Sequence, residues 1–92
     1  MTMLIALTCR DKAGALPVRQ ANRDAHLAYI AETGVVNQAG PFLDSDGAMC
    51  GSLVILEVDD MAAAQTWAAG DPYAKAGLFD SVSLDVWKRV VG

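Results

Sequence analysis

The sequence of this 92-residue chain predicts one α+β domain, residues 1–92, with the element order β-α-β-β-α-β. Two observations predict this class. Apolar segments typical of strands alternate with two segments typical of helices, and residues that favour turns separate them. Two βαβ units in so short a chain form a four-stranded antiparallel sheet with both helices on one face, which is the ferredoxin-like arrangement.

The first half of the chain is predicted to hold two strands and a helix. The expected elements are a strand at Met3–Cys9, a loop at Arg10–Ala15, a helix at Leu16–Thr33 and a strand at Val35–Ala39. Pro17 suits the first turn of a helix, where its missing N–H costs nothing, and Gly34 is a natural stop. Gly40-Pro41 is expected to end or bulge the second strand.

The second half repeats the alternation after a turn-rich loop at Asp44–Cys50. The expected elements are a strand at Gly51–Val58, a helix at Met61–Ala69, a short turn or helical piece at Tyr73–Gly77 and a strand at Phe79–Val86. Asp59 or Asp60 can cap the helix, and Gly70-Asp71-Pro72 ends it.

The first and third strands are apolar on both alternating faces, which predicts a sheet covered on both sides. Two helices cover only one face. In addition, 53% of the residues are hydrophobic, which is more than one small core needs. A second copy of the same sheet is the simplest cover for the other face, so the sequence predicts a homodimer packed sheet to sheet.

Charge and composition exclude several classes of function. The net charge of −4 argues against non-specific nucleic-acid binding, which needs clustered lysine and arginine. No apolar run is long enough for a transmembrane helix, and the N-terminal stretch lacks the basic region of a secretory signal. Cys9 and Cys50 match no metal-ligand spacing, so we expect reduced thiols and a cytoplasmic location, although a disulfide stays open. No phosphate loop, dinucleotide fingerprint or metal cluster is found, so no cofactor or metal is expected.

The only histidine, His26, lies in the first helix. At about 100° per residue, Arg19, Arg23, His26 and Ile30 fall in one stripe roughly 60° wide. In one interpretation Leu27 and Ile30 enter the core while the arginines and His26 lie at its solvated edge. In the other, the stripe lines a pocket at the edge of the sheet for an anionic or enolisable small molecule.

Asp71, Ser52 and Tyr73 are the other candidates, each with an ordinary structural alternative. Asp71 before a proline is common at a helix stop, but a carboxylate bonded to one imidazole nitrogen also makes the other nitrogen a better base. Ser52 at a strand start is usually structural, and beside a His-Asp pair it becomes a hydrogen-bond donor to substrate. Tyr73 is either a packing residue or a pocket wall.

Several short motifs, taken in order, resemble the YciI-like (YCII-related) family of small bacterial proteins. They are Arg23-x-x-His26-Leu27, Gly40-Pro41, Gly51-Ser52, Ala64-x-x-Trp67, Asp71-Pro72-Tyr73 and Ala76-Gly77. The resemblance covers essentially the whole chain. It implies a dimeric α+β barrel with an active site built on His26 and Asp71, with Ser52 as a third member. Relatives in that family include a dehydrochlorinase acting on a chlorinated hydroxyquinol, and the fold is similar to that of muconolactone isomerases.

The leading functional hypothesis is therefore an enzyme of lyase or isomerase type acting on a small cyclic or phenolic substrate. Asp71 would orient His26, His26 would act as the general base, and Arg23 or Ser52 would stabilise the developing oxyanion. The alternative is a non-catalytic dimeric module that binds a small anionic metabolite or a partner protein. A third interpretation, a structural subunit without a pocket, requires His26 to be exposed and unpaired.

Overall fold

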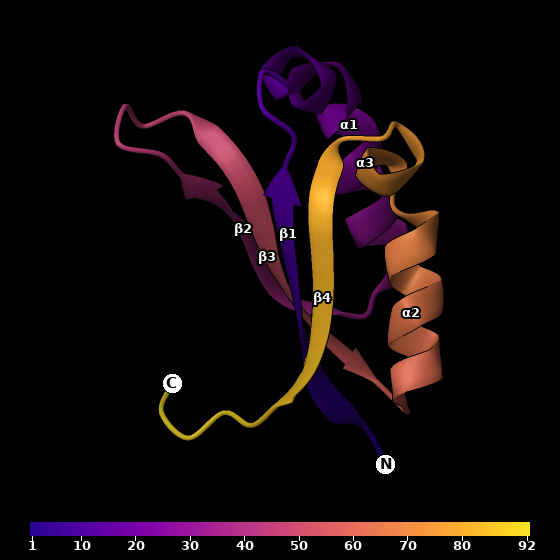
Figure 1. Ribbon diagram of the computed structural model, residues 1–92. Helices are drawn as coiled ribbons and strands as arrows, with labels where there is room; N and C mark the ends of the chain where they lie inside the picture. Colours follow the sequence, from indigo (N-terminus) through magenta and orange to yellow (C-terminus); the bar gives the residue numbers. More distant parts are fainter.

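The computed structural model describes residues 1–92 and contains a four-stranded antiparallel sheet with the strand order β2-β3-β1-β4 (Figure 1). The elements in chain order are β1 (Met3–Asp11), α1 (Leu16–Thr33), β2 (Val36–Leu43), β3 (Met49–Val58), α2 (Met61–Gly70), α3 (Pro72–Lys75) and β4 (Phe79–Trp87). This confirms the predicted α+β, ferredoxin-like class.

All four strands are longer than the sequence pattern predicts. β4 gains only Trp87, and β3 begins at Met49, so the loop expected at Asp44–Cys50 is wrong for its last two residues. The loop expected from Arg10 is wrong for its first two residues, because Arg10 pairs with Gly51 and Asp11 with Phe79. β2 is not ended at Gly40-Pro41 but continues to Leu43. A proline is tolerated there because β2 lies at the edge of the sheet, so the missing N–H need not remove a bond to a further strand.

The hydrophobic core lies between the sheet and the helices. Alternate residues of β1 and β3 face it, as the pleat requires, and Ala64 and Trp67 of α2 close over them. The strand residues of this cluster are Ile5, Leu7, Cys9, Val54, Leu56 and Val58. Two hydrogen bonds tie the two long helices together: Trp67 Nε1 donates to Thr33 Oγ1, and Tyr29 donates its hydroxyl to the Trp67 carbonyl, both at 2.9 Å.

The helix ends follow local chemistry. Gly34 adopts the left-handed conformation, with φ of 67°, at the end of α1. Of the two aspartates that could cap α2, Asp60 does so by accepting a bond from Ala63 N at 2.8 Å. Asp71 caps the short helix α3 by accepting a bond from Tyr73 N at 3.0 Å. The Asp-Pro step after α2 therefore both stops one helix and starts another.

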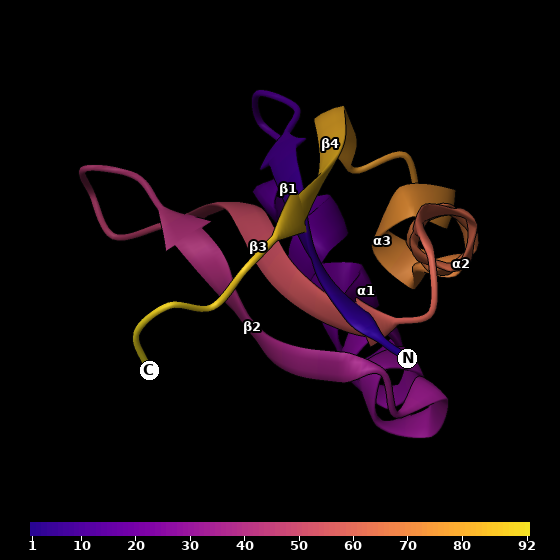
Figure 2. The ribbon, with the colours of Figure 1, turned by 90° about the horizontal axis from the view of Figure 1, so that it is seen from below.

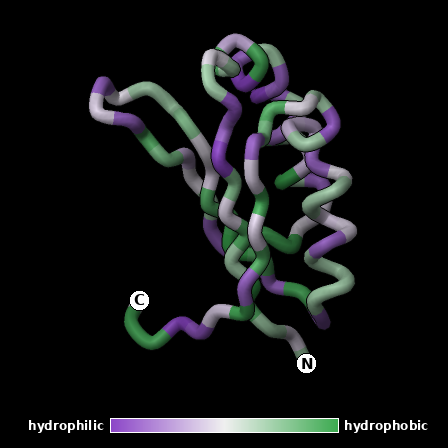
Figure 3. Tube along the Cα trace, in the orientation of Figure 1, coloured by the Kyte–Doolittle hydropathy of each residue, from purple (hydrophilic) through white to green (hydrophobic).

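The helices leave the second face of the sheet uncovered (Figure 2). Leu4 and Trp87 are paired on this face, and Leu53 lies on it as well. Leu53, in the central strand β3, and Trp87, at the end of the edge strand β4, are large apolar side chains that are each 37% exposed. The hydrophobic residues gather along the centre of the sheet, whereas the β2–β3 hairpin tip is hydrophilic (Figure 3). None of the helices is both long and apolar enough to span a bilayer.

Candidate active site

A cavity of about 180 Å³ lies between α1 and the β2–β3 edge of the sheet. Its polar lining consists of Arg19, Arg23, His26, Ser52 and Tyr73. The rest of the lining includes Leu27, Ile30, Pro41, Met49 and Val54. An engineered apolar cavity of about 150 Å³ binds benzene, so this space suits one substituted six-membered ring. A mostly apolar pocket with a few convergent polar groups is typical of small-molecule sites.

The α1 stripe faces this cavity, so the interpretation as a solvated edge is wrong for two of its members. Arg19 is 2% and His26 is 6% exposed. Leu27, which that interpretation placed in the core, is instead 49% exposed, because it lies at the cavity mouth and not over the sheet centre. Arg23 does remain exposed while it lines the cavity. The interpretation as a structural subunit with an exposed, unpaired His26 is contradicted by the same burial.

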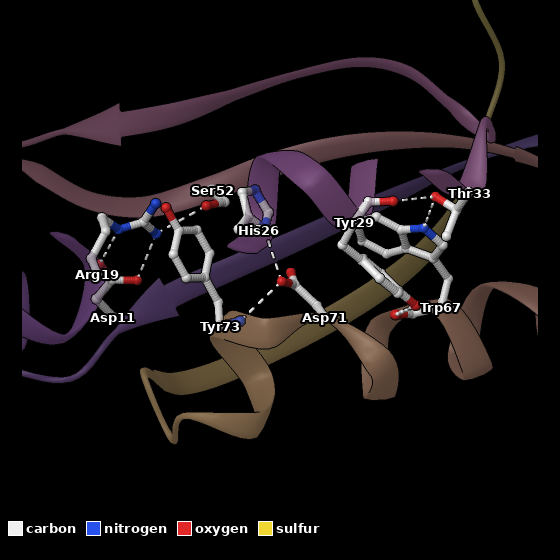
Figure 4. A network of polar contacts seen from close by, with 9 residues as sticks. All are labelled: Asp11, Arg19, His26, Tyr29, Thr33, Ser52, Trp67, Asp71 and Tyr73. Carbon is white, nitrogen blue, oxygen red and sulfur yellow. Dashed lines mark hydrogen bonds and ion pairs between the residues drawn. The ribbon is translucent and has the colours of Figure 1, made fainter. Parts of the chain in front are cut away.

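His26 and Asp71 meet although 45 positions separate them in the chain (Figure 4). His26 Nδ1 lies 2.8 Å from Asp71 Oδ1, and both side chains are buried. An ionised carboxylate only accepts hydrogen bonds, so in a neutral imidazole this contact places the hydrogen on Nδ1 and leaves the lone pair of Nε2 free. The same Asp71 oxygen accepts the bond from Tyr73 N, which fixes the carboxylate from the backbone side.

Tyr73 holds the face of the imidazole. Its ring is stacked on His26 with centroids 4.0 Å apart and an interplanar angle of 16°, and it also meets Phe79 edge-on at 6.1 Å. The tyrosine is 2% exposed, so it is both a packing residue and a wall of the cavity. Burial raises the pKa of the Tyr73 hydroxyl and outweighs the opposing charge of Arg19, so the phenol stays neutral at neutral pH.

Arg19 joins α1 to two strands. Its Nε and Nη2 donate to the two oxygens of Asp11 at 2.7 and 2.9 Å, and Nη2 also donates to Ser52 Oγ at 2.9 Å. Burial alone would lower the pKa of Arg19, but the hydrogen bond and charge of Asp11, with a further contribution from Tyr73, together outweigh it and raise that pKa. Sequence reasoning missed Asp11 because it assigned the residue to a loop. Extending the alternation of Ile5, Leu7 and Cys9 by one step places Asp11 on the helix-facing side.

Cys9 lies on β1 directly opposite Ser52 of β3, beneath the polar cluster. Burial raises the pKa of this thiol to about 12, with a further contribution from Asp71. A protonated thiol is a poor nucleophile, so Cys9 contributes packing at neutral pH. Both cysteines are free. Nowhere do three histidine, cysteine, aspartate or glutamate side chains gather closely enough to hold a metal ion.

Comparison with known sequences identifies a family and several relatives that this chain resembles. Residues 3–88 match the model of the YCII-related domain. The chain is 38% identical to Protein YciI of Escherichia coli in an alignment 97 positions long, which covers 96% of this chain and 99% of the relative. With the same coverage, it is 33% identical to an uncharacterized protein of Haemophilus influenzae.

Solved structures support the same relationship. The 5-chloro-2-hydroxyhydroquinone dehydrochlorinase of Burkholderia phenoliruptrix, in complex with 2,5-dihydroxybenzoquinone, matches with a TM-score of 0.87 and 34% identity over 94% of each chain. A putative antibiotic biosynthesis monooxygenase of Bacteroides thetaiotaomicron matches with a TM-score of 0.61 at 10% identity, covering 98% of this chain and 90% of the other. The second likeness shows the fold alone.

Proposed function

The chain belongs to the YCII-related family, and from that premise we propose that it is a small-molecule enzyme of lyase or isomerase type. His26 is the general base and Asp71 orients it. The observation that carries the proposal is the 2.8 Å contact between His26 Nδ1 and Asp71 Oδ1 on the wall of a ring-sized cavity. That contact leaves Nε2 as the basic nitrogen of the imidazole.

The substrate class is a small cyclic compound with acidic hydroxyl groups, such as a phenol or hydroxyquinone. The cavity volume of about 180 Å³ favours a single ring. Arg23 lines the cavity and makes no ion pair within the chain, so its guanidinium is free to contact an oxygen anion. The dehydrochlorinase that resembles this chain was solved with a ligand of this kind, 2,5-dihydroxybenzoquinone.

In the proposed reaction, His26 Nε2 takes a proton from a ring hydroxyl or an activated carbon. Asp71 stabilises the imidazolium that forms, and Arg23 or Ser52 stabilises the negative charge on the substrate oxygen. In an isomerisation His26 returns the proton to a ring carbon. In an elimination a leaving group departs as an anion and the proton passes to solvent. Positioned acid–base groups of this kind contribute about 10²–10⁴-fold, which suits an already activated substrate.

We also propose that the enzyme is a homodimer in which a second copy covers the open face of the sheet. The apolar side chains on that face, Leu53 and Trp87 among them, support this. The two free thiols favour a reducing compartment, the cytoplasm. No nucleic-acid or membrane partner is part of the proposal.

The alternative function, a non-catalytic module that binds a small anion, uses the same cavity with Arg23 and His26 as ligand contacts. One experiment distinguishes the enzyme from the binding module. It measures turnover of 5-chloro-2-hydroxyhydroquinone and related hydroxyquinols, and binding of 2,5-dihydroxybenzoquinone, in the wild type and in His26→Gln. An enzyme loses turnover in His26→Gln by at least about 10²-fold while binding changes little. A binding module shows no turnover in either protein and loses affinity instead. Glu32→Gln, an exposed change on the same helix, is the matched control.

A further inference from the structure

We propose that Asp11 and Arg19 are positioning residues that fix the Ser52 hydroxyl as a hydrogen-bond donor to an oxygen atom of the bound molecule. This inference rests on the proposed function, because it concerns the same cavity. It assigns roles to two residues outside the His-Asp pair, one at the end of β1 and one in the first turn of α1.

The guanidinium of Arg19 has little freedom to move (Figure 4). It is 2% exposed, and its Nε and Nη2 engage both carboxylate oxygens of Asp11 in a two-pronged arrangement. Such a pair fixes the plane of the guanidinium as well as its position. With one Nη2 hydrogen committed to Asp11, the other is directed at Ser52 Oγ, 2.9 Å away.

Ser52 is equally well fixed from its backbone. It lies within β3, paired with Cys9 of β1 on one side and with Pro41 of β2 on the other. Its oxygen accepts the bond from Arg19, and the hydrogen bonds of the protein provide no acceptor for its own proton. Because Ser52 lines the cavity, that proton is available to a bound molecule. Accepting a bond from a cation also makes a hydroxyl a stronger donor.

The same guanidinium connects Ser52 to the base. Arg19 lies 4.6 Å over the ring of Tyr73, and the same ring is stacked on the imidazole of His26. One side of the cavity thus carries a proton acceptor, and another carries a hydroxyl donor. Because Asp11 neutralises the charge of Arg19, the Ser52 hydroxyl suits a carbonyl oxygen or a developing oxyanion better than a fully charged anion. The arrangement points to a substrate ring with two oxygens, one that loses its proton to His26 and one that accepts from Ser52.

A double-mutant cycle tests the inference, with the dissociation constant of 2,5-dihydroxybenzoquinone as the readout. The variants are Ser52→Ala, the pair Asp11→Asn with Arg19→Gln, and all three changes together. The paired change removes both charges at once, so no unpaired charge is left buried. We expect Ser52→Ala and the paired change each to weaken binding about tenfold, and their combination to weaken it no further. Effects that multiply to about a hundredfold, or wild-type affinity in the paired variant, would overturn the inference.

Arg19→Lys provides a second test that does not depend on the paired variant. Lysine keeps the charge, but its single nitrogen cannot reproduce the fixed fork that Arg19 directs at Asp11 and Ser52. We expect a folded protein whose affinity for the quinone matches that of Ser52→Ala, whereas the exposed change Arg10→Lys leaves it unaltered. Wild-type affinity in Arg19→Lys would contradict the inference. Binding without any turnover would contradict the proposed enzyme instead. The double-mutant cycle would still test the roles of Asp11 and Arg19 in that case, because its readout is binding.

Discussion

The imidazole of His26 lies parallel to the phenol ring of Tyr73, with centroids 4.0 Å apart and planes inclined by 16°. Asp71, two residues before Tyr73, holds the edge of the same imidazole through Nδ1. The corner between α2 and α3 therefore fixes both the face and the edge of the candidate base. The orientation of the imidazole therefore depends on how this corner packs against α1.

Two substitutions of Tyr73 distinguish the role of its ring from the role of its hydroxyl. Tyr73→Phe keeps the stack, so quinone binding is expected to stay within about threefold of wild type, since a stacked pair contributes about 0.5–1.5 kcal/mol. Tyr73→Leu removes the stack and leaves a space, so it should lower the free energy of unfolding by about 2–3 kcal/mol and weaken binding about tenfold. Urea unfolding and quinone titration measure the two effects. Equal behaviour of both variants would show that the stacked ring does not position His26.

Asp71→Asn isolates the charge of the carboxylate. Asparagine keeps a side-chain oxygen for Tyr73 N, so the α3 cap and the fold are expected to persist. The imidazolium that forms during proton transfer loses its anionic partner, so kcat should fall about 10²–10⁴-fold. Steady-state kinetics on a hydroxyquinol and thermal unfolding give the two readouts. A fall in unfolding temperature that accounts for all lost activity would assign Asp71 a structural role only.

Gly51 is predicted to be intolerant of a side chain although its backbone is ordinary β structure. A Cβ there would lie 2.5 Å from the Cys9 carbonyl oxygen, which belongs to the neighbouring strand and cannot move freely. We expect Gly51→Ala to lower the free energy of unfolding by about 1–3 kcal/mol, through overpacking. Gly40→Ala, on the edge strand with nothing within 4 Å of its Cβ, is the matched control and should change stability little. A Gly51→Ala protein as stable as the control would contradict this packing.

The buried thiol of Cys9 is expected to make the folded protein less stable at alkaline pH. Its pKa is raised to about 12 in the folded protein, so the folded state holds the thiol proton more tightly than the unfolded state does. The resulting stabilisation is complete below about pH 9 and is lost as the pH rises toward 12, by up to about 1.4 kcal/mol per pH unit. Urea unfolding between pH 8 and about pH 11 should therefore show a shallower decline for Cys9→Ala than for the wild type.

The comparison for Cys9 concerns slopes, because Cys9→Ala also changes packing and so shifts the whole curve. The raised pKa values of Tyr29 and Tyr73 act in the same direction in both proteins and cancel. Cys50→Ala serves as the control for removing a thiol. Identical slopes for wild type and Cys9→Ala would contradict the assignment.

The proposed homodimer predicts twice the chain mass by sedimentation at micromolar concentration. Leu53→Arg places a charge on the open face of the sheet and should convert the dimer to a monomer without unfolding it. Gln65→Arg adds the same charge on the exposed side of α2 and should leave the dimer intact. A wild-type protein that sediments as a monomer would remove the dimer from the proposal.

The element order could be predicted from the sequence because it depends on local patterns. Apolar alternation marks Met3–Cys9 and Phe79–Val86, and Pro17 and Gly34 mark the ends of α1 within a residue. The ends of the strands could not be predicted as well from the sequence. Pro41 stops a central strand but not an edge strand, and the position of a strand in the sheet is not a local property.

The sequence by itself determined which residue types were available for chemistry: one histidine, set in one helical stripe with Arg19 and Arg23. Helix periodicity does not distinguish a solvated edge from a cavity wall, because both need the same spacing. The resemblance to the YCII-related family implied Asp71 as the partner of His26, but only the tertiary structure gave their contact and placed Asp11 beside Arg19, since these contacts join elements that are separate in the chain. The physical reason is that periodicity fixes where a side chain points on its own element, whereas burial and hydrogen-bond partners depend on what packs against it.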